Sequence, residues 1–291
     1  MASLDDKRFV IIGAGAVGCS LAAALRARGL TVAAVASRSD VSARRGAELA
    51  GTPLATTDPA EAARAGDVVV LSVPDDAIAQ VCQAVAAGGG FGDEDVSVHL
   101  SGALGSDVLA PARRHGAAVL SFHPAQTFAR ADPGLFEGIV VALEGDGPAL
   151  AVGQALARRL GATPVVLRAD QKVLYHAALC VGCNYVVALA DVAHRLLLEA
   201  GLGDHAPDAY LPLLRASVRN IEAVGPAKAL TGPVSRGDVA TVERHLQALE
   251  DQAPELVALY RVVGLRTIET ALAKGSISRE QADALRRVLR V

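Results

Sequence analysis

The chain has 291 residues, and 52% of them are hydrophobic, which is enough to build large cores without disulfide bonds. A formal net charge of −3 and an aromatic content of 3% argue against binding to nucleic acid or to an anionic membrane. The four cysteines lack the spacing of a small disulfide-bonded domain. The N-terminal stretch MASLDDKRFVIIGAG does not read as a signal peptide, because acidic residues precede an apolar run that ends in glycine. We therefore expect a cytoplasmic protein.

Short apolar runs alternate with helical patterns in the first half of the chain. The runs predict strands at 8–12, 31–36, 67–73, 96–100, 118–122, 139–143 and 163–167. Helical patterns lie between several of them, near 16–28, 58–65, 75–87, 105–115 and 148–160. Apolar runs of this kind, separated by helices, are typical of a parallel sheet covered on both faces. The segment 123–147 is rich in proline and glycine and is expected to form a loop and an off-pattern strand.

The pattern changes after residue 168, because only helical periodicity follows. The predicted helices lie at about 170–200, 207–223, 238–250, 254–274 and 278–290. The sequence therefore predicts an α/β fold, with a doubly wound, mostly parallel Rossmann sheet over 1–168 and an all-α domain over 169–291. The most apolar stretch, 177–190, is too short to cross a bilayer, and we expect it to be a buried core helix.

A glycine-rich motif follows the first predicted strand. In FVIIGAGAVG, Gly13, Gly15 and Gly18 have the G-x-G-x-x-G spacing, and a helix and a second strand come next. This context is typical of a dinucleotide site, in which the second glycine lets the backbone approach a pyrophosphate. The free N–H groups at the helix start then bind the phosphates. We expect Ala16 and Val17 to contact the cofactor together with these three glycines.

The end of the second strand indicates which dinucleotide is bound. An NAD site usually carries an acidic residue there, about 20 residues after the loop, to bind the ribose hydroxyls. This chain has Ser37, Arg38 and Ser39 instead, and a guanidinium flanked by hydroxyls suits a 2′-phosphate. The sequence therefore predicts NADP(H). In the alternative, Arg38 is a solvated surface residue and Asp40 binds the ribose of NAD.

Other strand ends should reach the same site, because ligands of doubly wound sheets bind beyond the carboxyl ends of the strands. The predicted strand 67–73 runs into a proline, and the strand at 96–100 is followed by a serine and a glycine. We expect cofactor contacts from Ser72, Val73, Pro74, Ser101 and Gly102. Substrate contacts are expected from Ser101 and from His123, which follows the next strand.

Three motifs extend the comparison to a known family. The stretches HPAQTF (123–128), KVLYHAA (172–178) and LTGPVSRGD (230–238) resemble the Rossmann-like oxidoreductases whose C-terminal half is a domain of unknown function, DUF2520. That family is similar in fold to the 6-phosphogluconate dehydrogenase-like superfamily, which includes ketopantoate reductase and pyrroline-5-carboxylate reductase. The resemblance implies a dinucleotide-dependent reductase that forms a homodimer through its helical domain.

The resemblance also indicates catalytic residues at the start of the first long helix. Hydroxyacid dehydrogenases of the superfamily place a lysine there and an asparagine one turn later. Lys172 fits the lysine position, and His176 stands where the asparagine would be. Residues four apart share a helix face. We expect one of the two to donate the proton and the other to orient the substrate; a structural alternative for Lys172 is a first-turn lysine that reaches water.

Further substrate contacts are expected from the helical domain, at Asn184, Thr231, Gly232 and Pro233. Asn184 could instead bond across helices as a buried amide. The loop at 231–233 could be a plain turn before Asp238, which is a candidate N-cap. We expect no metal site, because the C-x-x-C pair Cys180 and Cys183 lies within a helix and suits packing better than coordination.

Taken together, the sequence predicts an NADPH-dependent reductase of a small carbonyl compound, with ketopantoate or a related 2-oxo acid as the most concrete substrate. Two alternatives remain open at this point. One is a regulatory protein that binds NADP without turnover, and the other is an imine reductase that resembles pyrroline-5-carboxylate reductase.

Overall fold

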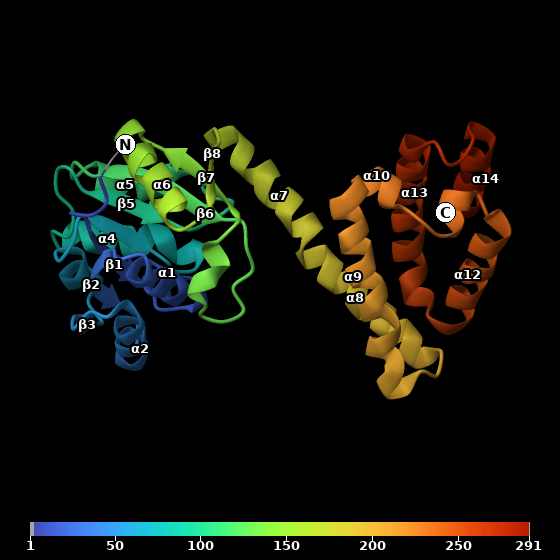
Figure 1. The fold of residues 1–291 in the computed structure, drawn as a ribbon, viewed down its shortest axis with the longest axis horizontal. Helices are drawn as coiled ribbons and strands as arrows, with labels where there is room; N and C mark the ends of the chain where they lie inside the picture. The colour runs from blue at the N-terminus through green and yellow to red at the C-terminus, as the bar shows by residue number, and fades with distance from the viewer. Residues whose placement is uncertain (1–2, 291) are drawn as a thin grey trace. The chain divides into compact units, whose positions relative to one another are not determined.

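A computed structural model describes residues 3–290 and divides into two compact units, one up to Gly182 and one from Cys183. We refer to them as the sheet unit and the helical unit and describe each by itself (Figure 1).

The sheet unit is built on one eight-stranded sheet with the order β3-β2-β1-β4-β5-β6-β7-β8. The strands are β1 (Arg8–Ile12), β2 (Thr31–Ala36), β3 (Ala55–Thr56), β4 (Val68–Leu71), β5 (Val96–His99), β6 (Ala118–Pro124), β7 (Val140–Gly145) and β8 (Thr163–Val166). Neighbouring strands are parallel except for β6 and β7, which are antiparallel. This order reverses beside β1, so the sheet is doubly wound and the predicted fold class is confirmed.

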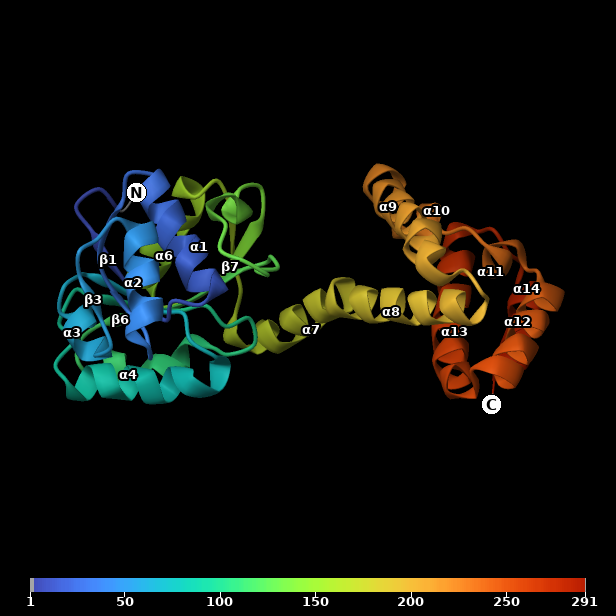
Figure 2. The same ribbon diagram turned by 90° about the horizontal axis from the view of Figure 1, so that it is seen from below.

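Helices cover both faces of this sheet (Figure 2). One face carries α1 (Ala16–Ala27), α2 (Asp40–Ala50) and α6 (Gly147–Arg159), and the other carries α3 (Pro59–Ala63), α4 (Ile78–Ala87) and α5 (Ala110–Arg113). Short 3₁₀ turns occur at η1 (Asp75–Ala77), η2 (Ser106–Leu109), η3 (Pro133–Phe136) and η4 (Ala169–Gln171). Helices α1 and α2 start at the carboxyl edge of the parallel strands, where the site is built, whereas α6 follows the antiparallel β7 and starts at the opposite edge.

Helix α2 was missing from the predicted elements. It buries only Ala43, Gly46, Ala47 and Ala50 against the sheet. Small residues leave a weak hydrophobic periodicity, so the pattern on which the prediction relied was faint. The omission matters, because Ser42 and Arg45 of α2 line the cavity described below.

Local features fix the ends of several helices. Asp58 caps α3 by accepting from the backbone N–H of Ala60. Gly29 and Gly161, which follow helix ends, have φ angles of 73° and 84°, where a side chain would be strained. Ser278 starts the last helix through a capping box. The irregular segment 123–147 contains a loop and ends in β7, the antiparallel strand.

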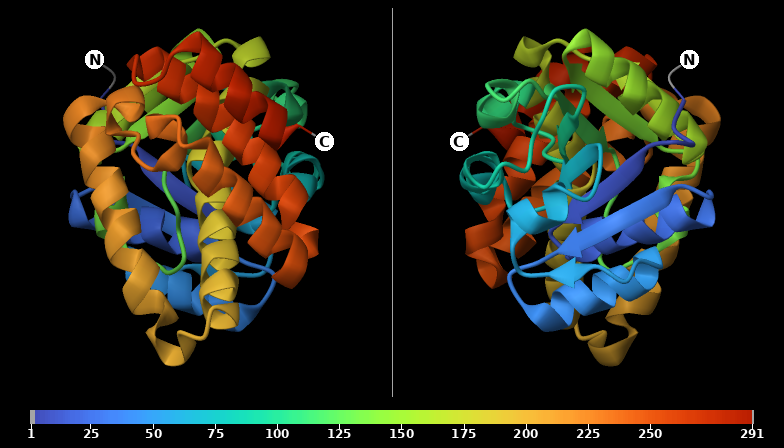
Figure 3. Two further views of the ribbon diagram at one scale, coloured as in Figure 1. Left: turned by 90° about the vertical axis from the view of Figure 1, so that its right-hand side faces the viewer. Right: turned by 90° about the vertical axis from the view of Figure 1, so that its left-hand side faces the viewer.

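The helical unit contains α8 (Asn184–Glu199), α9 (Ala206–Val224), α10 (Pro226–Ala229), α11 (Pro233–Arg236), α12 (Val239–Gln252), α13 (Val257–Lys274) and α14 (Arg279–Leu289), with 3₁₀ turns η5 (Gly203–His205) and η6 (Pro254–Leu256). Its buried core lies among α11 to α14 and includes Val242, Ile268, Leu285 and Leu289. Figure 3 (left) shows the ribbon of these helices in orange and red.

The boundary between the two compact units does not fall at the residue where strands give way to helices. The last strand ends at Val166, and only helices follow, in keeping with the change predicted at residue 168. The compact units divide later, between Gly182 and Cys183, because α7 (Lys172–Gly182) begins with a side chain that is buried in the sheet unit. The predicted helix 170–200 is also interrupted at Cys183, whose φ of −127° and ψ of −70° are not helical.

The expectation that 177–190 is a buried core helix was wrong for the isolated chain. Tyr185 and Val187 are 59% and 68% exposed, and no residue of α8 is buried. Within residues 169–199 the chain is long and apolar enough to cross a membrane by length and composition. An exposed apolar helix of this kind also suits an interface between protein subunits.

Candidate functional site

The glycine loop joins β1 to α1, and its three glycines have different reasons to be glycine. Gly13 has a φ of 110°, and a Cβ there would overlap the carbonyl oxygen of Ser72. A Cβ on Gly18 would overlap the carbonyl oxygen of Gly13. Gly15 differs, because its φ is −78° and a Cβ would meet nothing within 4 Å. No protein contact requires glycine at position 15, whereas a ligand held against the backbone would.

The start of α1 is suited to hold phosphate. Its N-cap is Gly15, which offers no side-chain oxygen to the first-turn N–H groups, and the first turn contains no acidic residue. Free N–H groups and the helix dipole favour an anion at such a position. Together with the open space beside Gly15, these features fit the pyrophosphate of a dinucleotide.

A cavity of about 700 Å³ extends from this loop along the ends of β1, β2 and β4. Its lining includes Gly13, Gly15, Ser37, Arg38, Ser42, Arg45, Ser72, Val73 and Pro74. Arg45 also donates from Nη2 to the carbonyl oxygen of Ala14, at 3.1 Å, so its guanidinium lies beside the glycine loop. The cavity therefore gathers two guanidiniums and two hydroxyls at the end of β2, where a 2′-phosphate would bind.

Sequence reasoning found only part of this group. Ser39, predicted as a cofactor ligand, does not line the cavity and instead caps α2, accepting from the N–H of Ser42 at 3.2 Å. Ser42 and Arg45, which do line it, were missed because α2 itself was not predicted. Ser42 and Arg45 follow Arg38 by about one and two helical turns. This spacing would have pointed to them as cavity residues if a helix had been predicted there.

A second cavity of about 270 Å³ continues from the first toward the end of β5. The two share Gly15, Ser72, Val73 and Pro74, and the second adds Ala16, Val17, Asp75, Leu100 and Ser101. Together they form an extended groove across the carboxyl edge of the sheet. The predicted cofactor residues Ala16, Val17, Ser72, Val73, Pro74 and Ser101 all lie along it. Asp75, at the start of η1, was not predicted.

The hydroxyl of Ser101 is fully used within the protein. It donates to Asp75 Oδ2 at 2.6 Å and accepts from the N–H groups of Ala103 and Leu104 at 3.3 and 3.1 Å. A hydroxyl has one hydrogen to donate. Ser101 therefore shapes the groove and fixes the following turn, and its side chain has no free hydrogen for a substrate.

Lys172, predicted as a catalytic residue, is buried next to Ser101 and does not itself line the groove. The residue is 1% exposed, and Nζ donates to Ser121 Oγ at 2.6 Å and to the carbonyl oxygen of Ser101 at 3.3 Å. Burial lowers the pKa of its ammonium, an effect that Glu144 and Asp75 partly oppose. The lysine ties the residue after β5 to β6, a contact that suits a positioning role, and its role as proton donor to the substrate stays a prediction.

Two histidines and a tyrosine gather around Gly102 instead. A Cβ on Gly102 would lie 2.8 Å from Nε2 of His123 and 2.5 Å from Cδ2 of His176. His123 Nδ1 lies 3.0 Å from the hydroxyl of Tyr175, and its ring meets that of His176 edge-on, with centroids 5.9 Å apart. Of the predicted residues, Gly102, His123 and His176 are therefore brought together, and Tyr175 was missed.

His123 is uncharged at neutral pH. Burial lowers its pKa to about 4, and the nearby charge of Lys172 acts in the same direction, followed by His176; Asp75 opposes them. Burial raises the pKa of the Tyr175 hydroxyl, so this group keeps its proton. The pair thus combines a neutral imidazole and a protonated phenol within hydrogen-bonding distance.

His99 is a structural histidine of β5. Its Nδ1 accepts from the N–H of Ser101 at 3.1 Å, and Nε2 lies 3.1 Å from the carbonyl oxygen of Gly105, which requires the proton to be on Nε2. Burial, together with the charge of Lys172, lowers its pKa to about 4. Both ring nitrogens are satisfied, so His99 holds the turn after β5 in place.

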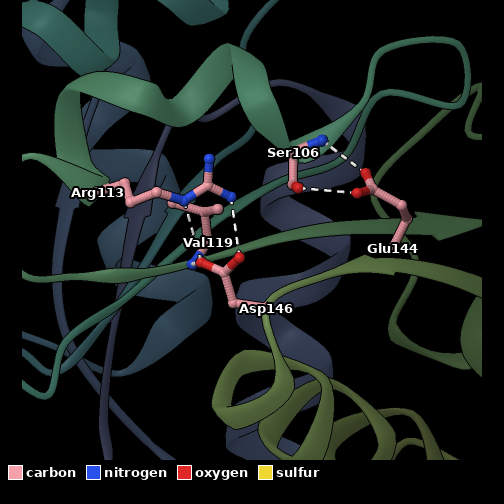
Figure 4. Close-up of polar contacts among 5 residues, drawn as sticks. All are labelled: Ser106, Arg113, Val119, Glu144 and Asp146. Atoms are coloured by element: carbon pink, nitrogen blue, oxygen red, sulfur yellow. Dashed lines mark hydrogen bonds and ion pairs between the residues drawn. The ribbon is translucent and has the colours of Figure 1, made fainter. Parts of the chain in front are cut away.

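Two carboxylates anchor the rest of the β5–β6 connection (Figure 4). Glu144 accepts from the N–H and the hydroxyl of Ser106, at 2.6 and 2.9 Å. Asp146 forms a two-point ion pair with Arg113 and accepts from the N–H of Val119. These contacts tie η2 to β7, and they tie α5 and the start of β6 to the residue before α6.

Comparisons with known proteins agree with this geometry. The profile of a Rossmann-like domain matches residues 4–124, and that of a domain of unknown function (DUF2520) matches residues 139–267. The chain joins a Rossmann-like domain to a DUF2520 domain. The DUF2520 match begins within the sheet unit, before β7, and so includes strands as well as helices.

Among solved structures, a candidate NADP oxidoreductase from Bacteroides fragilis is 29% identical to the chain, with a TM-score of 0.75, and covers 91% of this chain and 99% of its own. A Thermotoga maritima protein is 26% identical, with a TM-score of 0.69 and coverage of 96% and 100%. A pyrroline-5-carboxylate reductase from Coxiella burnetii is 16% identical, with a TM-score of 0.58 and coverage of 98% and 99%, and shares the fold. No curated protein matches the chain.

The substrate residues predicted in the helical unit differ in their surroundings, because one is exposed and two line a cavity. Asn184 is exposed at the start of α8, so the picture of a buried amide was wrong. Thr231 and Pro233 line an apolar cavity of about 330 Å³ among α8, α12 and α13, and Gly232 has a φ of 94°. Asp238 caps α12, as predicted. Residues 3–290 contain no group of three side chains that could hold a metal.

Proposed function

We propose that the protein is an NADP(H)-dependent oxidoreductase. The observation that carries the proposal is the continuous groove from the two guanidiniums at the end of β2, past the open face of Gly15, to Ser101 at the end of β5. An extended dinucleotide would place its 2′-phosphate at the first end and its nicotinamide at the second. The resemblance to a candidate NADP oxidoreductase supports the same conclusion.

We propose that Arg38 and Arg45 together hold the 2′-phosphate. Each charge-assisted hydrogen bond to phosphate is worth about 1.5–3 kcal/mol, which corresponds to roughly ten- to hundredfold in affinity. Titration of NADPH and NADH against Arg38→Asp and Arg45→Glu should weaken NADPH binding by at least about tenfold and leave NADH binding nearly unchanged.

The chain offers a matched control for that titration. Arg44 lies beside Arg45 but points into an ion pair with Asp40, at 2.7 Å, and does not line the cavity. Arg44→Glu makes the same charge change in the same helix and should leave the preference for NADPH intact. Equal binding of the two cofactors by the wild-type protein would contradict the NADP(H) assignment.

We propose that the substrate is a small carbonyl compound, with ketopantoate or a related 2-oxo acid as the first candidate. Bound NADPH would supply a hydride to the carbonyl carbon. The protein's part is to hold the substrate beside Ser101 and Gly102 and to supply hydrogen bonds to the oxygen that gains charge. NADPH oxidation across a panel of 2-oxo acids and cyclic imines tests this and separates carbonyl from imine reduction. Tight NADPH binding without turnover of any member would favour a regulatory protein.

We further propose that the protein acts in the cytoplasm as a homodimer formed through its helical unit. All four cysteines are free thiols, which suits a reducing compartment. Apolar side chains are exposed on α8, α9 and α13, including Val187, Leu213 and Val262 at 66–69%. A monomer in light scattering at micromolar concentration would contradict the dimer.

A further inference from the structure

Among the side chains around Gly102, His123 uses only one of its two ring nitrogens in a hydrogen bond. His123 Nδ1 is paired with the hydroxyl of Tyr175, but Nε2 has no hydrogen-bond partner among residues 3–290. That nitrogen is not among the fully buried side-chain atoms that lack a partner, so it keeps some exposure. It lies against the backbone of Gly102, next to Ser101, which lines the groove.

The hydrogen bond between Tyr175 and Nδ1 of His123 sets the tautomer of the imidazole if the tyrosine hydroxyl is the donor. Burial raises the pKa of Tyr175, so its hydroxyl keeps a hydrogen that can be donated to Nδ1. The imidazole is neutral, and its single proton is then on Nε2. In this arrangement a hydrogen on Nε2 points away from Tyr175 and is available to a group bound beside Gly102.

We propose that Tyr175 and His123 form a proton relay for the reduction, and that Lys172 is a positioning residue behind it. The inference rests on the proposed function. As the carbonyl carbon gains a hydride with its electron pair, the C=O π pair moves to the oxygen. Nε2 of His123 gives its proton to that oxygen, Nδ1 takes the proton of the Tyr175 hydroxyl, and the tyrosine oxygen regains a proton from water. The imidazole is neutral before and after the step.

The surroundings of His123 suit this role. Lys172, Tyr175 and His176 face it from α7, and Asp75 lies nearby on η1. The ammonium of Lys172, held by Ser101 and Ser121, disfavours a second positive charge on the ring. A permanently charged imidazolium could not accept from Tyr175, so the buried lysine keeps the relay in its working form.

The relay can be tested without turnover by NMR of histidine-labelled protein. The chain has seven histidines, and His123→Asn identifies the signal of interest by its loss. The ¹⁵N shifts of wild-type protein at pH 7 should show the proton on Nε2, and a proton on Nδ1 would overturn the relay. In Tyr175→Phe the preference for that tautomer should fall.

The positioning role of Lys172 has its own readout. The midpoint of the His123 titration should be near pH 4 in the wild type. In Lys172→Met it should rise by about one pH unit, because a nearby positive charge has been removed, whereas Lys172→Arg should keep it low. If Lys172→Met does not fold, Lys172→Gln replaces it, because it removes the charge and keeps a hydrogen-bond donor. A midpoint that stays near pH 4 in the uncharged variant contradicts the charge effect, because burial alone would then explain it. A midpoint near 6.5 in wild-type protein would overturn it.

Kinetics then separates the relay from the proposed function. His123→Asn should lower kcat by roughly 10²–10³-fold and Tyr175→Phe by about tenfold, with the KM for NADPH unchanged. His123→Asn with a kcat within threefold of wild type refutes the relay while leaving the reductase intact. Wild-type protein that binds NADPH but turns over no substrate refutes the proposed function and with it the relay.

Discussion

A substitution at Gly15 should change cofactor affinity without changing the stability of the fold. Its backbone angles of −78° and −171° are open to any residue, and a Cβ would meet no protein atom within 4 Å. In Gly15→Ala, the smaller entropy of the unfolded chain stabilises the fold by about 0.4–1 kcal/mol. Alanine is a poorer N-cap than glycine, which costs a similar amount. The two effects nearly cancel, so the free energy of unfolding should change by less than about 1 kcal/mol.

The new methyl group would nevertheless stand in the groove, between the start of α1 and any phosphate. We expect NADPH affinity to fall by at least about tenfold, or about 1.4 kcal/mol. Gly18→Ala is the matched control, because its Cβ would overlap the carbonyl oxygen of Gly13. That variant should be destabilised by about 2 kcal/mol or more, through crowding in a packed region.

Thermal unfolding with and without NADPH measures both effects. A change of 1 kcal/mol moves Tm by about 2–4 °C in a domain of this size, so Gly15→Ala should stay within that range and Gly18→Ala should fall below it. NADPH should raise the Tm of wild-type protein and have little effect on Gly15→Ala. If Gly15→Ala unfolds as early as Gly18→Ala, or binds NADPH as tightly as wild type, the assignment of Gly15 to the pyrophosphate is refuted.

Three further outcomes are expected. Arg45→Glu should lose NADPH affinity about tenfold while Arg44→Glu does not, measured by fluorescence titration; equal losses would show a general charge effect. His99 has a folded pKa of about 4 against an ordinary 6.5, so its neutral form is favoured by folding, and the stability present above pH 6.5 is lost as the pH falls toward 4. At about 1.36 kcal/mol per pKa unit, the neutral form of His99 contributes about 3 kcal/mol to the free energy of unfolding above pH 6.5. Urea unfolding should therefore show a smaller loss of stability between pH 7 and pH 5 in His99→Asn than in the wild type. Val187→Asp on α8 should convert a dimer to a monomer in light scattering, and a wild-type monomer would contradict the dimer.

The candidate site was only partly predictable from the sequence, and the reason differs between residues. Gly13, Gly15 and Gly18 were found because their spacing is imposed by local geometry within one strand, loop and helix. Ser42 and Arg45 were missed because α2 buries only small residues, which leave little periodicity. Asp75 and Tyr175 were missed because their importance comes from partners far away in the chain, Ser101 and His123.

Lys172 shows most clearly what the sequence alone could not determine. The sequence singled out a lysine one turn before His176 as unusual, but it did not show which groups the ammonium contacts. Only the tertiary structure shows that it donates to the carbonyl oxygen of Ser101 and to the hydroxyl of Ser121. A side chain with four flexible bonds can reach either side, and long-range packing selects one.

The sequence by itself determined the doubly wound sheet, most of its strands and helices, the helical second part and the glycine loop between β1 and α1. All of these depend on hydrophobic periodicity, glycine geometry and helix capping, which act over a few neighbouring residues. Which side chains meet at the carboxyl edge of the sheet was decided by tertiary structure. Ser101, His123 and Tyr175 come from three separate segments, and only the pairing of β5 with β6 and the packing of α7 bring them together.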